Sequence, residues 1–200
     1  MRVILASRSP RRREILSMLG VEFEIVSADA DESSTQTDSI ALVCELALRK
    51  GRATRELLIA RGEWDERTLI IASDTVVAKD NVILGKPKDD ADAAKMLRLL
   101  ANGVHRVISG VALLCGEREI TDADVTAVHF APMSDAEIAY YVQSGEPRDK
   151  AGAYAVQGLA SLWIEGLEGD YFNVVGLPVH RLNDLVRRFV GVSLPELSNK

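Results

Sequence analysis

The sequence contains only two cysteines among its 200 residues, Cys44 and Cys115, and they have no CxxC spacing. So little cysteine excludes a disulfide-rich secreted scaffold and a cysteine-based zinc ribbon. We expect both side chains to be buried thiols of a reducing compartment, and the cytoplasm is the expected location. A disulfide between the two remains open at this point, because sequence spacing alone does not exclude one.

Long apolar runs are also lacking. The first apolar stretch ends at Ser7 and is followed by arginines, so it is too short for a signal peptide. No other stretch reaches the roughly eighteen apolar residues of a membrane-spanning helix. We therefore expect no signal peptide and no membrane partner.

Positive charge is in deficit, with 24 Lys and Arg against 30 Asp and Glu and a formal net charge of -6. This balance argues against broad binding to nucleic acid or to anionic membranes.

The three histidines, His105, His129 and His180, do not have the spacing of a zinc site and are expected to be structural or surface residues. A hydrophobic content of 47% over this length predicts a single domain, residues 1–200, with a sizeable core.

A polar turn rich in arginine follows the first predicted strand, residues 3–6. Ser9 followed by Pro10 is typical of a helix start, because serine caps free N–H groups and proline gives up none that was needed. The positive end of such a helix attracts anions. The polar side chains around it suit a phosphate-rich ligand and are Ser7, Arg8, Arg11, Arg12 and Arg13. A solvated helix face is the alternative, and the turn by itself leaves both open.

Asp74 is the sharpest chemical signal, because it interrupts an apolar, strand-like run over residues 68–78. Burying a carboxylate is costly unless cations or hydrogen bonds compensate, so we expect Asp74 to face a functional site. A buried structural aspartate is the alternative. Lys86 follows in a cation-rich loop, held between Gly85 and Pro87 in a restricted backbone.

An acidic loop over residues 28–34 contains Asp29, Asp31 and Glu32, which could hold a divalent cation. Spacing alone favours the other interpretation, a solvated loop. Lys50 lies on a predicted long helix, where a salt-bridged surface lysine is the ordinary expectation.

The remaining pattern alternates strands and helices, which predicts an α/β fold. We expect helices at 11–19, 38–60, 89–100, 135–142 and 179–190, strands at 21–26, 104–115, 118–130 and 159–164, and a loose tail from Ser193 to Lys200. Gly51 is expected to weaken the long helix near its middle, and Ser134 with Glu137 predicts a capping box.

Several sequence blocks, taken in order, resemble the Maf family of nucleoside triphosphate pyrophosphatases over nearly the whole chain. The blocks are residues 7–14, 31–32, 46–50, 72–75, 85–87, His105 with 109–111, 149–154, 157–158, 169–171 and 173–178. The chain departs from the family at Gly51, where alanine is usual, and at Ala155, where glycine is usual. Neither difference removes a chemical group.

The resemblance implies a mixed, twisted sheet with flanking helices around a central cleft, similar to the inosine triphosphate pyrophosphatase-like (Maf/Ham) fold. It implies hydrolysis of a nucleoside triphosphate to the monophosphate and pyrophosphate, a house-cleaning activity on nucleotide pools, with a divalent cation, Mg²⁺ or Mn²⁺. It also implies a homodimer.

Asp74 matches the family's proton acceptor, and Glu32 with Asp74 would hold the metal. The substrate-binding positions matched are Ser7, Arg11, Arg12, Lys50, Thr75, Lys86 and Gln157. A carboxylate with an ordinary pKa of about 4 is a weak base, so it is best used on a metal-bound water. The sequence leaves open whether Asp74 is base, ligand or both.

Arg11, Thr75 and Gln157 together resemble the three-position code of the family members that prefer dTTP and UTP over 7-methyl-GTP. A glutamine amide offers both a donor and an acceptor to the polar edge of uracil or thymine.

Two other hypotheses for the function stay open here. The first is a nucleotide-binding regulator of cell division or septum formation without essential turnover, which an intact Asp74 disfavours. The second is a nuclease or phosphatase acting on other phosphate esters.

Overall fold

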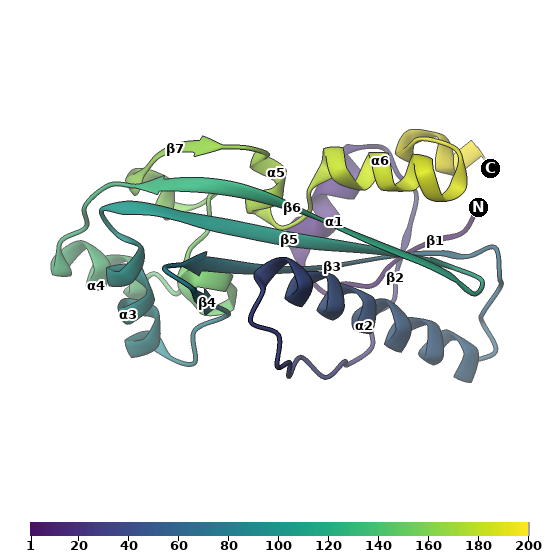
Figure 1. Ribbon diagram of the computed structural model, residues 1–200, viewed down its shortest axis with the longest axis horizontal. Helices are drawn as coiled ribbons and strands as arrows, with labels where there is room; N and C mark the ends of the chain where they lie inside the picture. The colour runs from purple at the N-terminus through teal and green to yellow at the C-terminus, as the bar shows by residue number, and fades with distance from the viewer. Residues whose placement is uncertain (200) are drawn as a thin grey trace. The chain divides into compact units, whose positions relative to one another are not determined.

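The computed structural model of the chain describes residues 1–199 and forms two compact units (Figure 1). The first unit comprises Met1–Asp74, Ser109–Asp124 and the chain from Gly176 onward, and the second comprises Thr75–Ile108 and Val125–Val175. That the two units act as the single domain expected over residues 1–200 stays a prediction.

Three long strands, β3 (Leu69–Lys79), β5 (Gly103–Cys115) and β6 (Arg118–Phe130), pass from one unit into the other. Among the described residues the strands are hydrogen-bonded in the order β2-β1-β3-β5-β6-β7, and β4 pairs with β3. β1 is parallel to β2 and to β3, whereas β4 is antiparallel to β3 and β7 is antiparallel to β6. The expected mixed α/β fold is confirmed.

In the first unit, β1 (Val3–Leu5) pairs with β2 (Glu24–Ile25) and with the start of β3, Val3 lying opposite Leu69. In Figure 1, helix α2 (Ser39–Ala60) lies on one side of these strands, and α1 (Pro10–Met18) and α6 (Val179–Val190) lie on the other. β1 and the first residues of β3 are continuous apolar runs and are buried, as expected for parallel strands covered on both faces, whereas both residues of β2 are exposed. The buried cluster of this unit contains Ile4, Ala6, Ala47, Leu58, Ile70, Ala72, Ala112 and Leu114.

Helix α2 begins where the sequence predicts, because the Asp38 carboxylate accepts a hydrogen bond of 2.8 Å from the backbone N–H of Ala41. Gly51 does not interrupt it. A Cβ at this position would lie 2.3 Å from Cδ1 of Leu114, so the glycine lets α2 approach β5 closely. The expected weak point is therefore a site of tight packing.

The second unit contains β4 (Val82–Leu84), α3 (Asp90–Leu100), α4 (Asp135–Gln143), β7 (Ile164–Glu168) and α5 (Tyr171–Val175). Short 3-10 segments lie at Glu146–Asp149, Ala151–Ala153 and Leu159–Trp163. The predicted capping box is confirmed: Ser134 accepts a hydrogen bond from the backbone of Glu137, whose carboxylate accepts one from the backbone of Ser134.

The core of the second unit includes a buried aromatic group formed by His105, Phe130 and Tyr154. The His105 and Phe130 ring centroids are 5.1 Å apart, and His105 Nε2 lies 2.8 Å from the Tyr154 hydroxyl. Burial lowers the pKa of His105 to about 4, so the imidazole is neutral at physiological pH. His105 is therefore structural, as expected.

Two sequence-based assignments of local structure are wrong. Residues 159–164 were expected to be a strand, but Leu159–Trp163 is a 3-10 segment that buries Ala160 and Trp163 on one side, a spacing of three that suits this helix. The chain from Ser193 was expected to be a loose tail, but Leu194–Asn199 forms the 3-10 segment η4, in which Leu194 and Leu197 are buried. Lys200 lies outside the described residues.

Smaller differences from the expectations concern a helix cap, the two thiols and the length of one strand. Ser9 is the N-cap residue of α1, but its side chain makes no capping hydrogen bond, and its backbone N–H donates to the Ser7 hydroxyl over 3.2 Å. Cys44 and Cys115 are free thiols; Cys115 is buried, but Cys44 is partly exposed. The second strand is also shorter than expected, at Glu24–Ile25.

Within residues 1–199, no helix is both long and apolar enough to cross a membrane.

Candidate active site

Asp74 lies in the buried part of β3, where the sequence placed it, and is 9% exposed. Its Oδ1 is 2.5 Å from Nζ of Lys50, which projects from the middle of α2. A buried carboxylate needs such a counter-charge, because desolvation disfavours an isolated ion. Sequence reasoning from residues alone identified Asp74 but had no local reason to select its partner.

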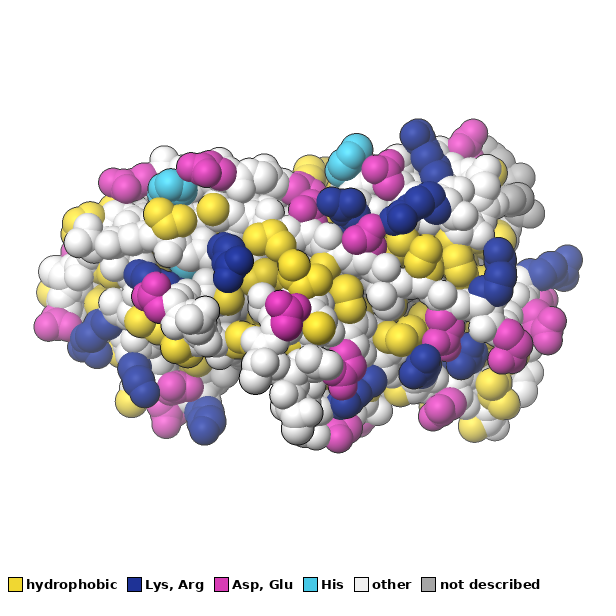
Figure 2. Space-filling view, in the orientation of Figure 1, with side chains coloured by type: hydrophobic (Ala, Val, Ile, Leu, Met, Phe, Trp, Pro, Cys, Tyr) yellow, Lys and Arg dark blue, Asp and Glu magenta, His cyan; other side chains and the backbone are white. Residues whose placement is uncertain are grey.

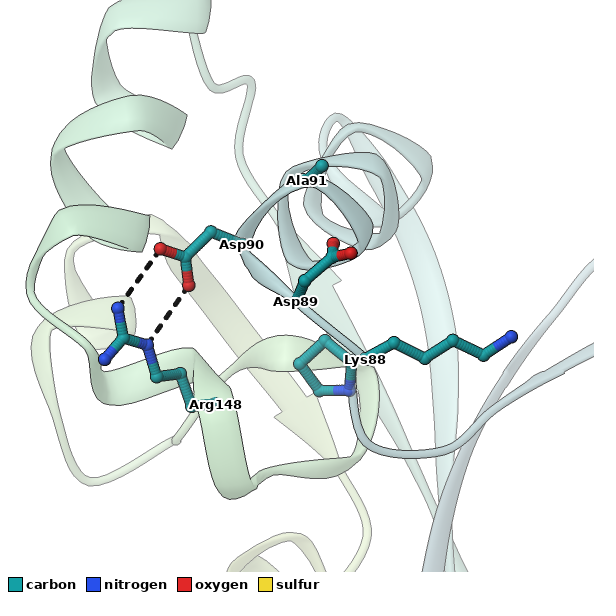
Figure 3. Close-up of a pocket in the computed structure, with 6 residues that line it drawn as sticks. Lys88, Asp89, Asp90, Ala91 and Arg148 are labelled. Carbon is teal, nitrogen blue, oxygen red and sulfur yellow. Dashed lines mark hydrogen bonds and ion pairs between the residues drawn. The ribbon is translucent and has the colours of Figure 1, made fainter.

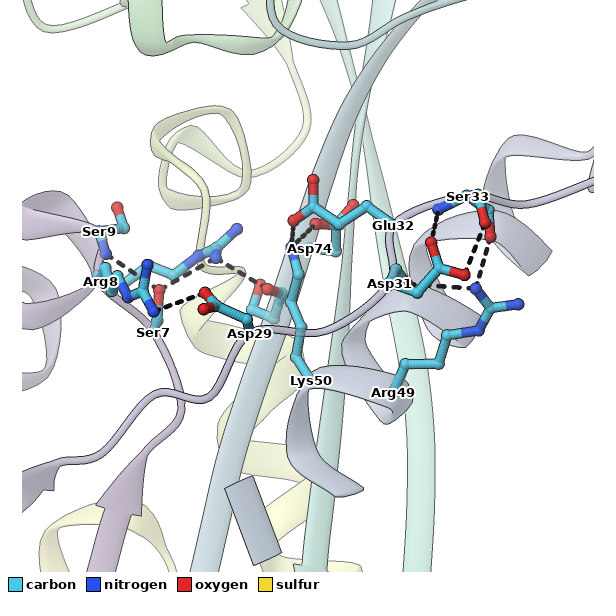
Figure 4. A network of polar contacts seen from close by, with 12 residues as sticks. Ser7, Arg8, Ser9, Asp29, Asp31, Glu32, Ser33, Arg49, Lys50 and Asp74 are labelled. Carbon is cyan, nitrogen blue, oxygen red and sulfur yellow. Dashed lines mark hydrogen bonds and ion pairs between the residues drawn. The ribbon is translucent and has the colours of Figure 1, made fainter. Parts of the chain in front are cut away.

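Glu32 approaches the same ammonium group from the acidic loop. Its Oε1 lies 2.7 Å from Lys50 Nζ, so Glu32 and Asp74 converge on one cation (Figure 4). The Glu32 side chain is 59% exposed and that of Asp74 is 13% exposed. One carboxylate thus faces solvent while the other is held in the strand.

Arg49, the neighbour of Lys50, holds the backbone on both sides of Glu32. Its Nη1 donates to the carbonyl oxygens of Asp31, over 3.2 Å, and Ser33, over 2.5 Å (Figure 4). Its Nη2 donates to the Glu45 carboxylate. The loop is also closed locally, because Ser33 donates two hydrogen bonds to the Asp31 carboxylate and lowers its pKa. The acidic loop is therefore anchored to α2 rather than merely solvated.

The arginine turn contributes Ser7 and Arg12 to the same unit. Arg12 Nη1 donates to the Ser73 carbonyl over 2.8 Å and to the Ser7 hydroxyl over 3.3 Å, and its Nε donates to the Gly176 carbonyl over 2.8 Å. Burial lowers the pKa of the Arg12 guanidinium, and the Asp74 carboxylate opposes that shift. Arg12 thus fixes the backbone immediately before Asp74.

The other arginines of the turn differ in their surroundings. Arg8 pairs with Asp29 over 2.7 Å, with both side chains largely exposed, and Arg13 is exposed on α1. Arg11 is partly buried beside Arg12, whose pKa it helps to lower. The turn is therefore neither a uniform solvated face nor a uniform anion site.

The residues fit a divalent cation that also has substrate ligands. Among the described residues, no three His, Cys, Asp or Glu side chains form a group able to hold a metal alone. Mg²⁺, however, is commonly bound by one or two carboxylates together with substrate phosphates. Glu32 and Asp74 supply two such carboxylates, and their convergence on Lys50 shows that a positive charge is favoured between them.

Three predicted substrate-binding residues belong to the second unit. Thr75 lies in β3, and Lys86 is exposed in the loop after β4. The Gly85 carbonyl in that loop accepts a hydrogen bond of 3.0 Å from the Gly152 N–H. Gln157 is exposed in the turn between two 3-10 segments. Their contribution to one binding site with the residues of the first unit stays a prediction.

A hollow of about 550 Å³ in the second unit lies at the start of α3 and does not contain the candidate residues. It is lined by Pro87, Lys88, Asp89, Asp90, Ala91 and Arg148. Arg148 makes two hydrogen bonds of 3.1 Å to Asp90 (Figure 3). The Asp89 carboxylate caps the helix by accepting a hydrogen bond from the Asp92 N–H. The acids already neutralise this helix end, so it does not attract an anion.

Arg49 is the residue of this site that sequence reasoning missed. The spacing of Glu45 and Arg49 along α2 could have indicated their pairing. Nothing local could have indicated that the same guanidinium reaches the carbonyls beside Glu32, since those lie 16 and 18 residues away.

Comparisons with known proteins concern the chain as a whole. A family model described as Maf-like protein matches residues 2–189. The chain is 46% identical over 195 residues to the dTTP/UTP pyrophosphatase of Alkaliphilus oremlandii, covering 96% of this chain and 98% of that protein. It is 44% identical to the protein of the same name from Symbiobacterium thermophilum, covering 94% and 93%.

Among solved structures, the Ham1 protein of Staphylococcus aureus matches 66% of this chain and 72% of its own, with 11% identity and a TM-score of 0.43. That likeness is weak, and the fold is established by the strands and helices themselves. The family match and the identities over nearly the full length are decisive: the chain belongs to the Maf family.

Proposed function

We propose that the chain is a nucleoside triphosphate pyrophosphatase that hydrolyses dTTP and UTP to the nucleoside monophosphate and pyrophosphate. The observation that carries this proposal is the convergence of Glu32 and Asp74 on Lys50. The chain is a member of the Maf family, and its relatives at 44–46% identity are named dTTP/UTP pyrophosphatases.

Asp74 is the proposed proton acceptor. Its carboxylate is held in a rigid strand by Lys50, and the preceding carbonyl is held by Arg12, so its orientation is fixed before substrate arrives. Such preorganisation is the main contribution that a protein makes to phosphoryl transfer. Asp74 then takes the proton of the attacking water.

Glu32 and Asp74 are the proposed ligands of Mg²⁺ or Mn²⁺. Such an ion, when bound, offsets the negative charge of the triphosphate and makes water a better nucleophile. The anchoring of the acidic loop by Arg49 supports this role, because it keeps the Glu32 carboxylate on the Asp74 side of the loop.

The phosphates are proposed to be bound by Ser7, Arg11, Arg12, Lys50 and Lys86. A triphosphate needs several positive charges and hydrogen-bond donors, and guanidinium groups suit its oxygens well. Thr75 and Gln157, with Arg11, are the proposed determinants of base preference. The exposed Gln157 amide has the donor and acceptor that a uracil or thymine edge requires.

We also propose a cytoplasmic homodimer without nucleic-acid or membrane partners. The two free thiols support a reducing location. On the face shown in Figure 2, basic and acidic side chains are interspersed rather than gathered by sign, which does not favour a polyanion as partner.

Product analysis tests the proposal. The protein is incubated with dTTP and with UTP, in each case with and without Mg²⁺, and the nucleoside monophosphate, pyrophosphate and inorganic phosphate formed are quantified. The proposal requires equal amounts of monophosphate and pyrophosphate, and loss of both when the metal is chelated. Release of inorganic phosphate would indicate a phosphatase, and nucleotide binding without products would indicate the regulator.

A further inference from the structure

The Tyr141 hydroxyl and the Glu146 carboxylate form a hydrogen-bonded pair in the second unit. The hydroxyl donates to Glu146 Oε1 over 2.7 Å. Tyr141 is fully buried on α4, with its ring centroid 5.7 Å from that of Trp163, so this hydroxyl has a fixed position. Burial and the neighbouring Glu146 raise the pKa of Tyr141, which keeps the hydroxyl protonated and able to donate.

Both members of the pair also hold the backbone near Gln157. The Tyr141 oxygen accepts a hydrogen bond of 3.2 Å from the Ala155 N–H, and Glu146 Oε2 accepts one of 3.0 Å from the Leu159 N–H. The two backbone groups lie two residues before and two residues after Gln157. The buried Tyr141 phenol and the Glu146 carboxylate thus bind the backbone at both ends of the segment that carries Gln157.

Gly158 makes this arrangement possible. A Cβ at this position would lie 2.1 Å from Glu146 Oε2, so the carboxylate occupies the space that any other side chain would need. The turn is closed by a backbone hydrogen bond of 3.2 Å from the Gly158 N–H to the Ala155 carbonyl. Gln157 is therefore an exposed residue of a turn whose backbone is held by hydrogen bonds to Tyr141 and Glu146.

We propose that Tyr141 and Glu146 are positioning residues for base selection: they fix the turn of Ala155–Leu159 so that the Gln157 amide meets the base in one orientation. This inference rests on the proposed role of Gln157 in reading the pyrimidine edge. An amide discriminates between bases through hydrogen-bond geometry, and a turn that moves freely would lose that discrimination while leaving the reacting groups intact.

The test is Tyr141→Phe, which keeps the buried ring and removes the hydroxyl. Its matched control is Tyr140→Phe, because Tyr140 is the next residue on α4 and is 60% exposed. The ratio of kcat/KM for dTTP to kcat/KM for GTP should fall at least fivefold in Tyr141→Phe, mainly through KM for dTTP. It should stay within twofold of the parent ratio in the control. A purely structural role would lower both activities together and leave the ratio unchanged, which would overturn the inference.

The double variant Tyr141→Phe/Gln157→Leu separates this inference from the proposed function. If Tyr141 acts through Gln157, the double variant has the same ratio as Gln157→Leu alone. A ratio that changes in Gln157→Leu but not in Tyr141→Phe refutes the positioning role and leaves the proposed function standing. An unchanged ratio in Gln157→Leu refutes base reading by this residue, and the positioning role with it.

Amide hydrogen exchange gives a measurement independent of turnover. In the free protein, exchange at Ala155 and Leu159 should accelerate at least tenfold in Tyr141→Phe and in Glu146→Gln, and not in Tyr140→Phe. Unchanged exchange at both amides would show that the pair does not hold the turn, and would overturn the inference even if selectivity changed.

Discussion

The Nζ of Lys50 lies 2.5 Å from Oδ1 of Asp74, so an ion pair joins the middle of the long helix α2 to the buried strand β3. The two residues are 24 positions apart. Asp74 is stabilised in a nearly dry position by a cation that Glu32 also contacts. This shared contact is the basis for the proposal that catalysis and metal binding occur at the same place.

Asp74→Asn should lower kcat by at least about a hundredfold, because an amide cannot accept the proton of the attacking water. Nucleotide binding should largely survive, since the shape of the side chain is kept. Asp29→Asn is the control, because Asp29 is an exposed acid paired with Arg8. Kinetics and binding should be measured on the same preparations, and a near-normal kcat in Asp74→Asn would refute the role.

Lys86→Ala should weaken triphosphate binding by about tenfold and leave nucleoside binding unchanged, because the lost charge is assigned to a phosphate contact. Lys88→Ala is the matched control, since Lys88 is an exposed lysine of the same loop. Calorimetric titration with UTP and uridine in metal-free buffer, where the proposal expects no hydrolysis, gives the comparison. Equal losses for both ligands, or equal losses in the two variants, would contradict a phosphate contact at Lys86.

Arg12→Ala should destabilise the protein by about 3 kcal/mol as well as impair activity, because it removes charged donors from the Ser73 and Gly176 carbonyls. Arg13→Ala, on the exposed side of the same helix, should change the free energy of unfolding by less than about 0.5 kcal/mol. Urea unfolding measures both. Similar stability of the two variants would show that the Arg12 hydrogen bonds do not brace the site.

His105 should make stability fall as the pH is lowered from neutrality. The unfolded state gains a proton near the ordinary pKa of 6.5, whereas the folded state resists it until about pH 4. The unfolded state therefore binds more protons in this window, and about 2 kcal/mol of stability should be lost between pH 7 and pH 5.

The comparison for this pH effect is His105→Gln, which has no titrating ring. At pH 7 the free energy of unfolding of the variant should be lower than that of the parent, because the contacts with Tyr154 and Phe130 change. Between pH 7 and pH 5 the free energy of unfolding of the variant should depend less on pH than that of the parent. A variant with the same pH slope as the parent would show that other groups cause the acid sensitivity.

Much of the fold could be predicted from the sequence because its signals are local. The Asp38 cap, the apolar run around Asp74 and the Ser134–Glu137 capping box each act within a few residues. The 3-10 segment Leu159–Trp163 was not predictable, because its conformation depends on burying Ala160 and Trp163 in a core built from distant parts of the chain.

The site was predictable only in part for the same reason. Asp74 and the arginine turn are visible as chemical exceptions to their surroundings. Glu45 with Arg49 is visible as a helical pair, but the reach of Arg12 to the Gly176 carbonyl spans 164 positions, and no sequence pattern encodes it. Family resemblance supplied Lys50 and Gln157, which no local pattern selected.

The most direct test of the account is a comparison of kcat/KM for dTTP, UTP, CTP, GTP and 7-methyl-GTP in one Mg²⁺-containing buffer, with pyrophosphate release as the signal. The account predicts that dTTP and UTP are the best substrates and that Gln157→Leu narrows their lead over the others. A clear lead for GTP or 7-methyl-GTP in the parent protein would contradict it.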